Sequence, residues 1–406
     1  MEIEEAVSSL IKELASVTEC EQVSLVNATG RILGEDVYAG IPVPSFPKAA
    51  MDGYAVRSSE IESASGDAPV RLDVIGRIFA GDPVPSSLRG ADIPARGAVR
   101  IMTGAIVPDA FDTVIRQEDT DCGEDVVSIR KSQGPFVNYC KVGEDIESGS
   151  RIASRGTLIG RAEAGVIASV GEASVNVLRK LRVAVISTGS EIVDIGTPLS
   201  EAQIYNNVAY MLKASLKSCA FEVELRSVPD DIDAIVEALN KACGSADIII
   251  TTGGVSVGQK DLLPEALDMI GAKKIFAGVN IKPGSPTIGA VIKGKALLCL
   301  SGNPYAAVAN FDLYIGSIIS AVTGCASYLP VRSQAVLMSE FDKPSNVRRL
   351  VRAAVVNGEV TILSNNQASS VLSSFVGANC YIDIPKGSSV SKGSKVDIIN
   401  IPEALL

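Results

Sequence analysis

The stretch Ile248–Asp261, IIITTGGVSVGQKD, decides how the rest of the chain is interpreted. It opens with a short apolar run that is typical of a fully buried strand. The run then breaks into a turn that contains Gly253, Gly254 and Gly258, and a helical pattern follows from about Lys260. Glycines between a strand and a helix let backbone N–H groups approach an anion, and the helix N-terminus adds positive potential. The pattern predicts an α/β domain with an anion site at this turn, although an ordinary tight turn would use the same glycines.

A second turn of this kind lies at Ser301–Pro304, between a strand-like run at 296–300 and a helical pattern at 305–323. Asn at the N-cap followed by Pro at the first helical position is a strong signal for a helix start. Two such turns in one parallel sheet would bring two loops to the carboxyl ends of its strands. We therefore expect a ligand to bind across that edge of the sheet.

Length and composition describe a large globular chain without a basic surface. The chain has 406 residues, of which 47% are hydrophobic and 21% charged, with a formal net charge of −10. Such a charge argues against a nucleic-acid partner, because phosphate neutralisation requires basic side chains. The acidic, amphipathic N-terminus does not resemble a signal peptide, and no apolar run is expected to span a membrane. These features predict a cytoplasmic protein with no membrane partner.

The residue types that are missing narrow the chemistry. There is no histidine, which excludes Ser-His-Asp and Cys-His mechanisms and imidazole metal sites. The eight cysteines show no CxxC spacing, so neither a zinc ribbon nor a thioredoxin-type motif is indicated. Cys219, Cys243 and Cys299 lie in apolar stretches and are expected to be reduced core residues. Carboxylates, Lys, Arg, Ser, Thr and a hard metal ion remain available for catalysis.

The order of the patterns predicts an α/β and β multidomain chain. The segments flanking the β-rich module would form one discontinuous linker module, because both lie beside it in the sequence. The expected boundaries are 1–23 for an N-terminal helix packed on the α/β domain, 24–45 and 142–178 for the linker module, 46–141 for the β-rich module, 179–328 for a three-layer α/β domain, and 329–406 for a C-terminal small β-barrel.

Several carboxylates stand where a strand ends. Glu191 and Asp261 would lie at adjacent strand ends of one sheet, where a phosphate-bound Mg²⁺ needs carboxylate ligands. Asp230 could equally be the N-cap of the helix that follows it. Asp52 and Thr103 sit beside glycines and are explained as turn residues by the sequence alone.

Six motifs, in this order, resemble those of the molybdopterin molybdenumtransferase family, which includes MoeA and the gephyrin E-domain. The motifs are AMDGYAV (50–56), IMTGA (101–105), STGSEI (187–192), TTGGVSVGQKD (251–261), KPGSP (282–286) and LSGNP (300–304). The resemblance extends from about residue 20 to the end of the chain. It implies a molybdopterin-binding α/β domain within four modules, a linker module that dimerises, and a homodimer whose active sites are shared between subunits.

The reaction implied by the resemblance is a step of molybdenum cofactor biosynthesis. In it, molybdenum from molybdate, or tungsten from tungstate, is inserted into adenylylated molybdopterin with Mg²⁺ present, and AMP is released. A partner protein could supply the adenylylated molybdopterin. Mg²⁺ would polarise the phosphoanhydride and neutralise the charge that develops on it.

The resemblance also assigns residues. The catalytic set would be Asp52, Thr103, Asp145, Glu191, Asp261 and Lys282, with Asp230 and Asp261 as the metal ligands. The cofactor-binding set would be Gly253, Gly254, Ser256, Gly258, Ser301, Gly302, Asn303, Pro304, Pro286, Arg352 and Ser369. Lys282, Pro286, Arg352 and Ser369 would form the oxyanion pocket, although Arg352 could also be an exposed strand residue. Asp52, Thr103 and Asp145 would act across the dimer interface.

The chain departs from the family at two expected lysines. Gly278 and Ser285 stand at these positions, and Phe111 stands where a small residue is commoner. Losing two positive charges should weaken the binding of a dianion. An alternative is therefore a non-catalytic molybdopterin-binding or scaffold paralogue. A third possibility, an unrelated ATP-using enzyme, is disfavoured because no GxxxxGK[ST] motif occurs.

Overall fold

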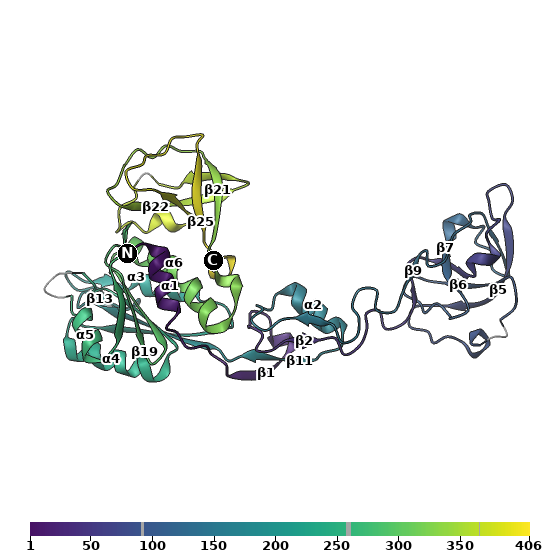
Figure 1. The fold of residues 1–406 in the computed structure, drawn as a ribbon, viewed down its shortest axis with the longest axis horizontal. Coiled ribbons are helices and arrows are strands. Elements are labelled where there is room, and N and C mark those ends of the chain that lie inside the picture. The colour runs from purple at the N-terminus through teal and green to yellow at the C-terminus, as the bar shows by residue number, and fades with distance from the viewer. Residues whose placement is uncertain (91–92, 257–260, 365) are drawn as a thin grey trace. The chain divides into compact units, whose positions relative to one another are not determined.

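The fold is seen in a computed structural model that describes residues 1–90, 93–256, 261–364 and 366–406. It contains two compact units (Figure 1). The first unit comprises Met1–Glu35, Ser154–Ala162 and Ser174–Leu406, and the second comprises Asp36–Ala153 and Glu163–Ala173. The chain therefore has a mixed α/β and β multidomain fold, as its sequence predicts.

A six-stranded sheet lies at the centre of the first unit, in the order β15-β12-β16-β20-β19-β17. Its strands are β12 (Leu181–Thr188), β15 (Phe221–Val228), β16 (Ile248–Thr252), β17 (Lys273–Ala277), β19 (Ile288–Ile292) and β20 (Lys295–Leu300). The strands β15, β12, β16 and β20 run parallel, whereas β19 and β17 are antiparallel to their neighbours. Every residue of β16 is buried, as expected for a strand covered on both faces.

Helices cover both faces of this sheet and make it a three-layer domain. They are α1 (Ile3–Ile11), α3 (Asn207–Ser215), α4 (Ile232–Ser245), α5 (Leu263–Met269) and α6 (Pro304–Thr323). Successive side chains of β12 point to opposite faces, so Val183 packs with α1, α3 and α6 in one core, while Ala184 packs with α4 and α5 in another. This alternation explains why the central strands β12, β16 and β20 are buried along nearly their whole length rather than on one side only.

The helix α6 forms the centre of the larger core. It is 20 residues long, and by length and composition it could cross a membrane, contrary to the expectation that no apolar run is long enough. Most of its residues are nevertheless buried within the unit, as in the core helix of a globular domain. It ends at Gly324, whose left-handed φ of 79° suits a helix C-terminus.

The C-terminal part of the first unit is a closed β-barrel. Its strands are β21 (Val331–Leu337), β22 (Arg348–Val356), β23 (Glu359–Ile362), β24 (Cys380–Ile384) and β25 (Lys395–Asn400). The order β22-β23-β21-β25-β24 closes because β22 also pairs with β24, which leaves the ring without a free edge. The short strand β18 (Ile281–Lys282) joins it by pairing in parallel with β22.

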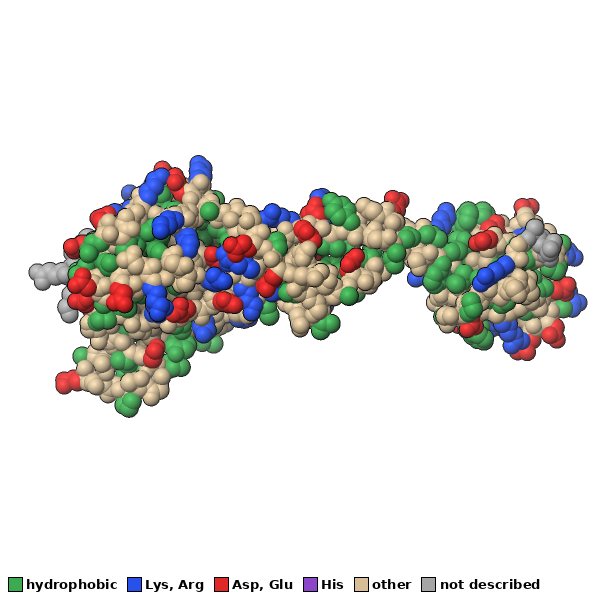
Figure 2. Space-filling view, turned by 90° about the horizontal axis from the view of Figure 1, so that it is seen from below, with side chains coloured by type: hydrophobic (Ala, Val, Ile, Leu, Met, Phe, Trp, Pro, Cys, Tyr) green, Lys and Arg blue, Asp and Glu red, His purple; other side chains and the backbone are tan. Residues whose placement is uncertain are grey.

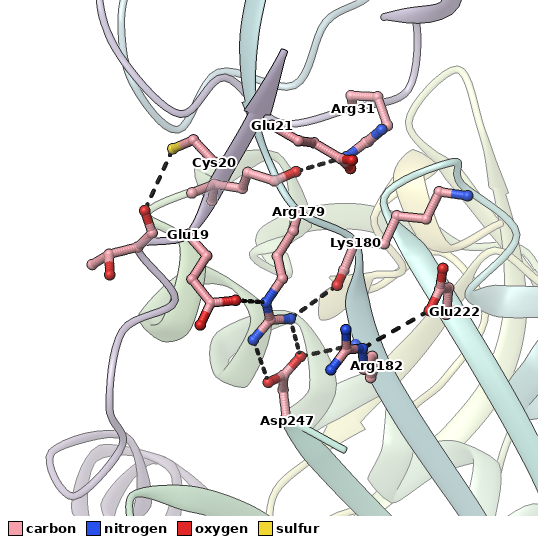
Figure 3. A network of polar contacts seen from close by, with 11 residues as sticks. Glu19, Cys20, Glu21, Arg31, Arg179, Lys180, Arg182, Glu222 and Asp247 are labelled. Atoms are coloured by element: carbon pink, nitrogen blue, oxygen red, sulfur yellow. Dashed lines mark hydrogen bonds and ion pairs between the residues drawn. The ribbon is translucent and has the colours of Figure 1, made fainter. Parts of the chain in front are cut away.

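Polar contacts attach the segment after α1 to the amino-terminal edge of the central sheet (Figure 3). Both terminal nitrogens of Arg179 donate to the Asp247 carboxylate, at 2.7 and 2.9 Å, and its Nε donates to Glu19. Nearby, β1 (Cys20–Ser24) pairs with β11 (Ser174–Leu178). The N-terminal helix therefore ends at Ile11, and the helical spacing expected over 1–23 is wrong beyond this point.

The second unit is built around a five-stranded sheet in the order β7-β4-β6-β5-β8. Its strands are β4 (Gly53–Val56), β5 (Val70–Ile78), β6 (Gly97–Ile101), β7 (Thr113–Arg116) and β8 (Val126–Ile129), with the shorter β2 (Val37–Tyr38), β3 (Lys48–Ala49), β9 (Tyr139–Cys140) and β10 (Arg151–Ala153) elsewhere in the unit. Ala55 belongs to one apolar cluster and Tyr54 to another, so both faces of the sheet are covered. The sequence pattern near 161–170 predicts a helix, and α2 (Arg161–Ser169) confirms it.

Two expectations about local structure are wrong in part. Apolar spacing over 205–220 predicts a helix of that length, but α3 spans only Asn207–Ser215, because its N-cap is Asn206 and β15 begins at Phe221. All eight cysteines are unpaired, but only Cys299 of the three expected core cysteines is buried, whereas Cys219 is exposed.

Positively and negatively charged side chains intermingle on the face of the molecule seen in Figure 2.

Candidate functional site

A cavity of about 900 Å³ opens at the carboxyl ends of the parallel strands of the first unit. Both glycine-containing turns border it, through Gly253 and Gly254 after β16 and through Ser301–Pro304 after β20. The strands β16 and β20 are adjacent and parallel, so their turns meet at one edge of the sheet, as the sequence predicts. Ser256 does not line this cavity, and Gly258 lies outside the described residues.

Gly253 is required by the packing of this turn. Its φ is +96°, and an added Cβ would lie 2.5 Å from the carbonyl oxygen of Thr188. Its N–H donates to the carbonyl oxygen of Leu300, which ties the turn to β20. Only glycine gives the backbone this close approach without strain.

The second turn leads directly into α6. Asn303 is at the N-cap and Pro304 is the first helical residue, but the Asn303 side chain makes no capping hydrogen bond. The Asn303 N–H donates to the Ser301 hydroxyl at 3.2 Å. The first turn of a helix carries N–H groups without intrahelical partners, so this end of α6 can bind an anion.

Hydroxyl and amide groups form the floor of the cavity. The Thr252 hydroxyl donates to the Ser187 hydroxyl, and the Ser187 hydroxyl donates to the side-chain oxygen of Asn206, at 3.0 and 3.2 Å. All three side chains are buried. These three residues were not predicted to belong to the site, although a polar side chain at the end of an apolar strand could have indicated them.

Three carboxylates predicted to be functional, Glu191, Asp230 and Asp261, line the same cavity. The N-cap of α4 is Asp231, which accepts from the Ala234 N–H, so Asp230 does not cap the helix. Asp230 instead accepts from the Ser190 N–H at 3.2 Å. Within the described ranges, no three acidic or sulfur ligands lie close enough together to hold a metal ion by themselves.

A second cavity, of about 350 Å³, lies between the α/β domain and the barrel within the first unit. Lys282 and Ser369, two of the four residues predicted to form an oxyanion pocket, line it. Lys343 and Arg349 of the barrel also line it, and neither was predicted to be a site residue. No local pattern marks these two residues, because the pairing of β18 with β22 brings Arg349 to Lys282, and Lys343 lies before β22 with its carbonyl accepting from Arg349.

Arg352 is fully buried, which contradicts its interpretation as an exposed strand residue. Its guanidinium lies 3.5 Å from the centre of the Tyr305 ring and 4.7 Å from that of Phe375. One terminal nitrogen donates to the carbonyl oxygen of Val371, while Nε and Nη2 have no hydrogen-bond partner among the described residues. Burial lowers the pKa of Arg352, and unpaired buried N–H groups of this kind favour an anion.

Tyr305 connects the two cavities. It follows Pro304 of the second turn, and its hydroxyl donates to the Leu350 carbonyl while accepting from the Arg352 N–H. Its own N–H donates to the Ser369 carbonyl at 2.9 Å. The beginning of α6 is thereby attached to the strand that carries Arg352 and to the segment that carries Ser369.

Of the segment between β18 and β19, Pro283 lines this second cavity, whereas Pro286 and Ser285 do not. Pro286 is half-buried. The Ser285 hydroxyl donates to the Ile281 carbonyl of the same loop. Gly278 has a left-handed φ of +85°, which a lysine would adopt only with strain. Gly284 allows the loop to contact α6, where the Asn310 amide donates to its carbonyl.

In the second unit, Asp52 and Thr103 form a pair. Both the N–H and the hydroxyl of Thr103 donate to Asp52 Oδ1 at 2.8 Å. These hydrogen bonds lower the pKa of Asp52, with a smaller contribution from Arg100. Asp145 is exposed in the same unit. The sequence alone explains Asp52 and Thr103 as separate turn residues. In the structure they form one hydrogen-bonded pair.

Three family profiles match the chain in succession. They are the MoeA N-terminal region (domain I and II) over residues 1–171, a probable molybdopterin binding domain over 184–321, and the MoeA C-terminal region (domain IV) over 334–401.

Relatives and solved structures agree with these profiles. A molybdopterin molybdenumtransferase of Staphylococcus epidermidis is 35% identical over 402 residues, which cover 98% of this chain and 94% of that protein. One from Staphylococcus aureus is 34% identical with the same coverage. A crystal structure of a molybdopterin biosynthesis MoeA protein from Pyrococcus horikoshii is 30% identical, covers 99% of both chains and gives a TM-score of 0.80. Together with the motifs around the first cavity, these matches establish that the chain belongs to the molybdopterin molybdenumtransferase (MoeA) family.

Proposed function

We propose that this chain is a molybdopterin molybdenumtransferase that inserts molybdenum or tungsten from its oxyanion into adenylylated molybdopterin and releases AMP. The observation that carries the proposal is the meeting of two glycine-containing turns and three carboxylates at one cavity. Such a cavity suits a ligand with phosphate groups, because backbone N–H groups bind the phosphates and carboxylates bind their metal ion. The apolar Leu199 and Ile204 on its wall suit a ligand that also has a ring system.

Mg²⁺ fits this set of donors as an ion held jointly by protein and substrate. Mg²⁺ is commonly bound through one or two carboxylates plus substrate phosphates, so the lack of a three-ligand cluster among described residues does not count against it. Asp230 and Asp261 would hold it, with Glu191 beside them. The ion would polarise the phosphoanhydride and stabilise the charge on the departing AMP. The turns at Gly253 and Ser301 would orient the phosphates through their backbone.

The second cavity would receive the oxyanion. Lys282 and Ser369 offer a cation and a hydroxyl donor at its wall. Arg352 lies behind Tyr305 with two unpaired N–H groups, and pairing with a dianion would satisfy them. Tyr305 borders this cavity and directly follows the turn at the first, which supports a reaction that brings the oxyanion and the pterin together.

A homodimer would complete the active site. By family resemblance, Asp52, Thr103 and Asp145 of one subunit act at the cavity of the other. The lowered pKa of Asp52 supports a group that stays ionised and accepts hydrogen bonds or binds a cation.

We further propose a cytoplasmic location, a partner that supplies adenylylated molybdopterin, and the module boundaries predicted above.

The alternative is a molybdopterin-binding scaffold without transferase activity. The absence of lysines at Gly278 and Ser285 favours it, because neither residue contributes charge to the second cavity.

AMP release from molybdopterin-AMP, measured with Mg²⁺ while molybdate and tungstate are titrated separately, distinguishes the two. The transferase predicts oxyanion-dependent release that Asp261→Ala abolishes. Tight pterin binding without release under either oxyanion would refute the transferase and favour the scaffold.

A further inference from the structure

The second cavity is lined by positively charged side chains, although the chain as a whole is acidic. Its wall contains Lys282, Lys343 and Arg349, and none of its lining residues is a carboxylate. The whole chain has a net charge of −10. Among the described residues, none of these three cations forms an ion pair, whereas most of the other buried or half-buried arginines have a carboxylate partner. Three unpaired cations around one cavity indicate a site for an anion.

The sheet brings two of these cations side by side. In the parallel pairing of β18 with β22, Lys282 is the register partner of Arg349. Like charges on directly neighbouring positions of a sheet repel one another, so this arrangement is unfavourable unless an anion lies between them. The strand pairing that carries this repulsion also forms the junction between the α/β domain and the barrel.

Arg349 is held in place by its surroundings. One of its terminal nitrogens donates to the Lys343 carbonyl at 3.1 Å, and its guanidinium lies 5.6 Å from the centre of the Phe341 ring. Holding the guanidinium reduces the entropy that would be lost on binding an anion. The same hydrogen bond fixes the backbone of Lys343. Both cations are therefore preorganised at the wall of the cavity.

We propose that Lys343 and Arg349 of the barrel are oxyanion-binding residues that supply the positive charge absent at Gly278 and Ser285. The ligand class is a tetrahedral dianion, bound by Lys282 from one side and by the two barrel cations from the other. The amides of Asn366 and Gln367, which also line the cavity, add neutral donors. The inference rests on the proposed function for the nature of the anion, and it makes the barrel a determinant of oxyanion affinity.

Direct binding tests this inference without requiring turnover. The affinity of the full-length chain for tungstate, and separately for molybdate, is measured by equilibrium dialysis in buffer free of sulfate and phosphate. We expect Lys343→Gln and Arg349→Gln each to raise the oxyanion Kd roughly tenfold, because each removes one charge-assisted hydrogen bond. Lys343→Arg, which keeps the charge, should stay within about threefold of the wild type.

Lys386→Gln is the matched control, since Lys386 is another exposed barrel lysine that does not line this cavity. It should leave the Kd unchanged, and the dependence of Kd on salt should become shallower only in the Lys343 and Arg349 variants. Thermal melting verifies that each variant is folded.

Three results would overturn the inference: equal effects of Lys343→Gln and Lys386→Gln, an unchanged Kd in folded Lys343→Gln and Arg349→Gln variants, or a wild-type chain that binds neither oxyanion. A different result would show that the proposed function is wrong. A wild-type chain that binds the oxyanion but releases no AMP would refute the transferase, while the dialysis series would still decide the role of the barrel cations.

Discussion

At the scale of single residues, Gly253 shows how backbone geometry shapes the first cavity. The turn passes so close to Thr188 that any side chain would collide with its carbonyl oxygen. The positive φ adds a second constraint, which favours glycine independently of the collision. The shape of this edge of the first cavity therefore depends on a residue with no side chain.

Gly253→Ala should lower the free energy of unfolding by about 2 kcal/mol through backbone strain and the clash with Thr188. Gly244→Ala is the control, because Gly244 lies in α4, has open space around its Cα and has no positive φ. It should be neutral or stabilising by about 0.5 kcal/mol. Chemical denaturation measures both, and equal stabilities would show that the turn relaxes to accept a side chain.

Arg352→Met should reduce oxyanion affinity at least tenfold while changing the free energy of unfolding by less than about 1 kcal/mol. The reason is that Nε and Nη2 are buried without partners among the described residues, so removing the charge also removes a desolvation cost. Melting and dialysis on the same sample give both values. A loss of several kcal/mol with unchanged oxyanion affinity would identify Arg352 as a structural residue instead.

Single-residue roles could be predicted from the sequence only where a local pattern carries them. Gly253 and Asn303 were predicted because a strand–turn–helix pattern surrounds each of them. The sequence could not decide between a helix cap and another role for Asp230, since the acid that caps α4 is its neighbour Asp231. Arg352 was open to interpretation as an exposed residue, because its burial depends on Tyr305 and Phe375.

At the scale of elements, α6 links the two cavities to the barrel. Its first turn borders the first cavity, and its middle places Asp312 against β24, where the Tyr381 hydroxyl donates to the Asp312 carboxylate at 2.5 Å. Burial raises the pKa of Asp312 to about 7, although the hydrogen bond from Tyr381 opposes this shift. A carboxyl group of this kind makes stability depend on pH.

Asp312→Asn should make the protein more stable than the wild type at pH 8, by about 2 kcal/mol. Between the unfolded pKa of 3.8 and the folded value of about 7, the folded state binds more protons, so wild-type stability falls as pH rises through this window. The advantage of the variant should shrink as pH approaches 4. Denaturation curves at pH 5 and pH 8 measure it, and a difference that does not depend on pH would contradict the raised pKa.

Strands were predicted better than helix ends and non-local pairings. β12, β16 and β20 follow from apolar runs bounded by turns, and the structure confirms them. The N-terminal helix was predicted too long, since apolar spacing continues past Ile11 without helical structure. The meeting of Lys282 with Arg349 was not predictable, because it arises from two strands separated by the rest of the α/β domain.

At the scale of the whole molecule, the proposal requires both units to contribute to one reaction. Asp261 belongs to the first unit, and the Asp52–Thr103 pair belongs to the second. Family resemblance implies that the two units come from different subunits of a homodimer. Sequence motifs identified both groups of residues, but no pattern within one chain could determine which copy completes which site.

Subunit mixing tests this arrangement. Asp52→Ala and Asp261→Ala should each abolish AMP release, and co-refolded mixtures should regain about a quarter of wild-type activity, because half of the dimers are mixed and each has one intact site. Mixing Asp261→Ala with Glu191→Ala is the control, because both residues belong to the first unit, and it should restore nothing. Mixtures of the first pair that stay inactive would show that each chain completes its own site.

The most direct test of the central claim is to count metal atoms bound in the pterin product against AMP released, in a single turnover with Mg²⁺. The account predicts equal amounts of inserted metal and AMP, with release that requires molybdate or tungstate. AMP released without metal insertion would indicate a hydrolase, and pterin bound without release would indicate a scaffold. Either result would contradict the transferase.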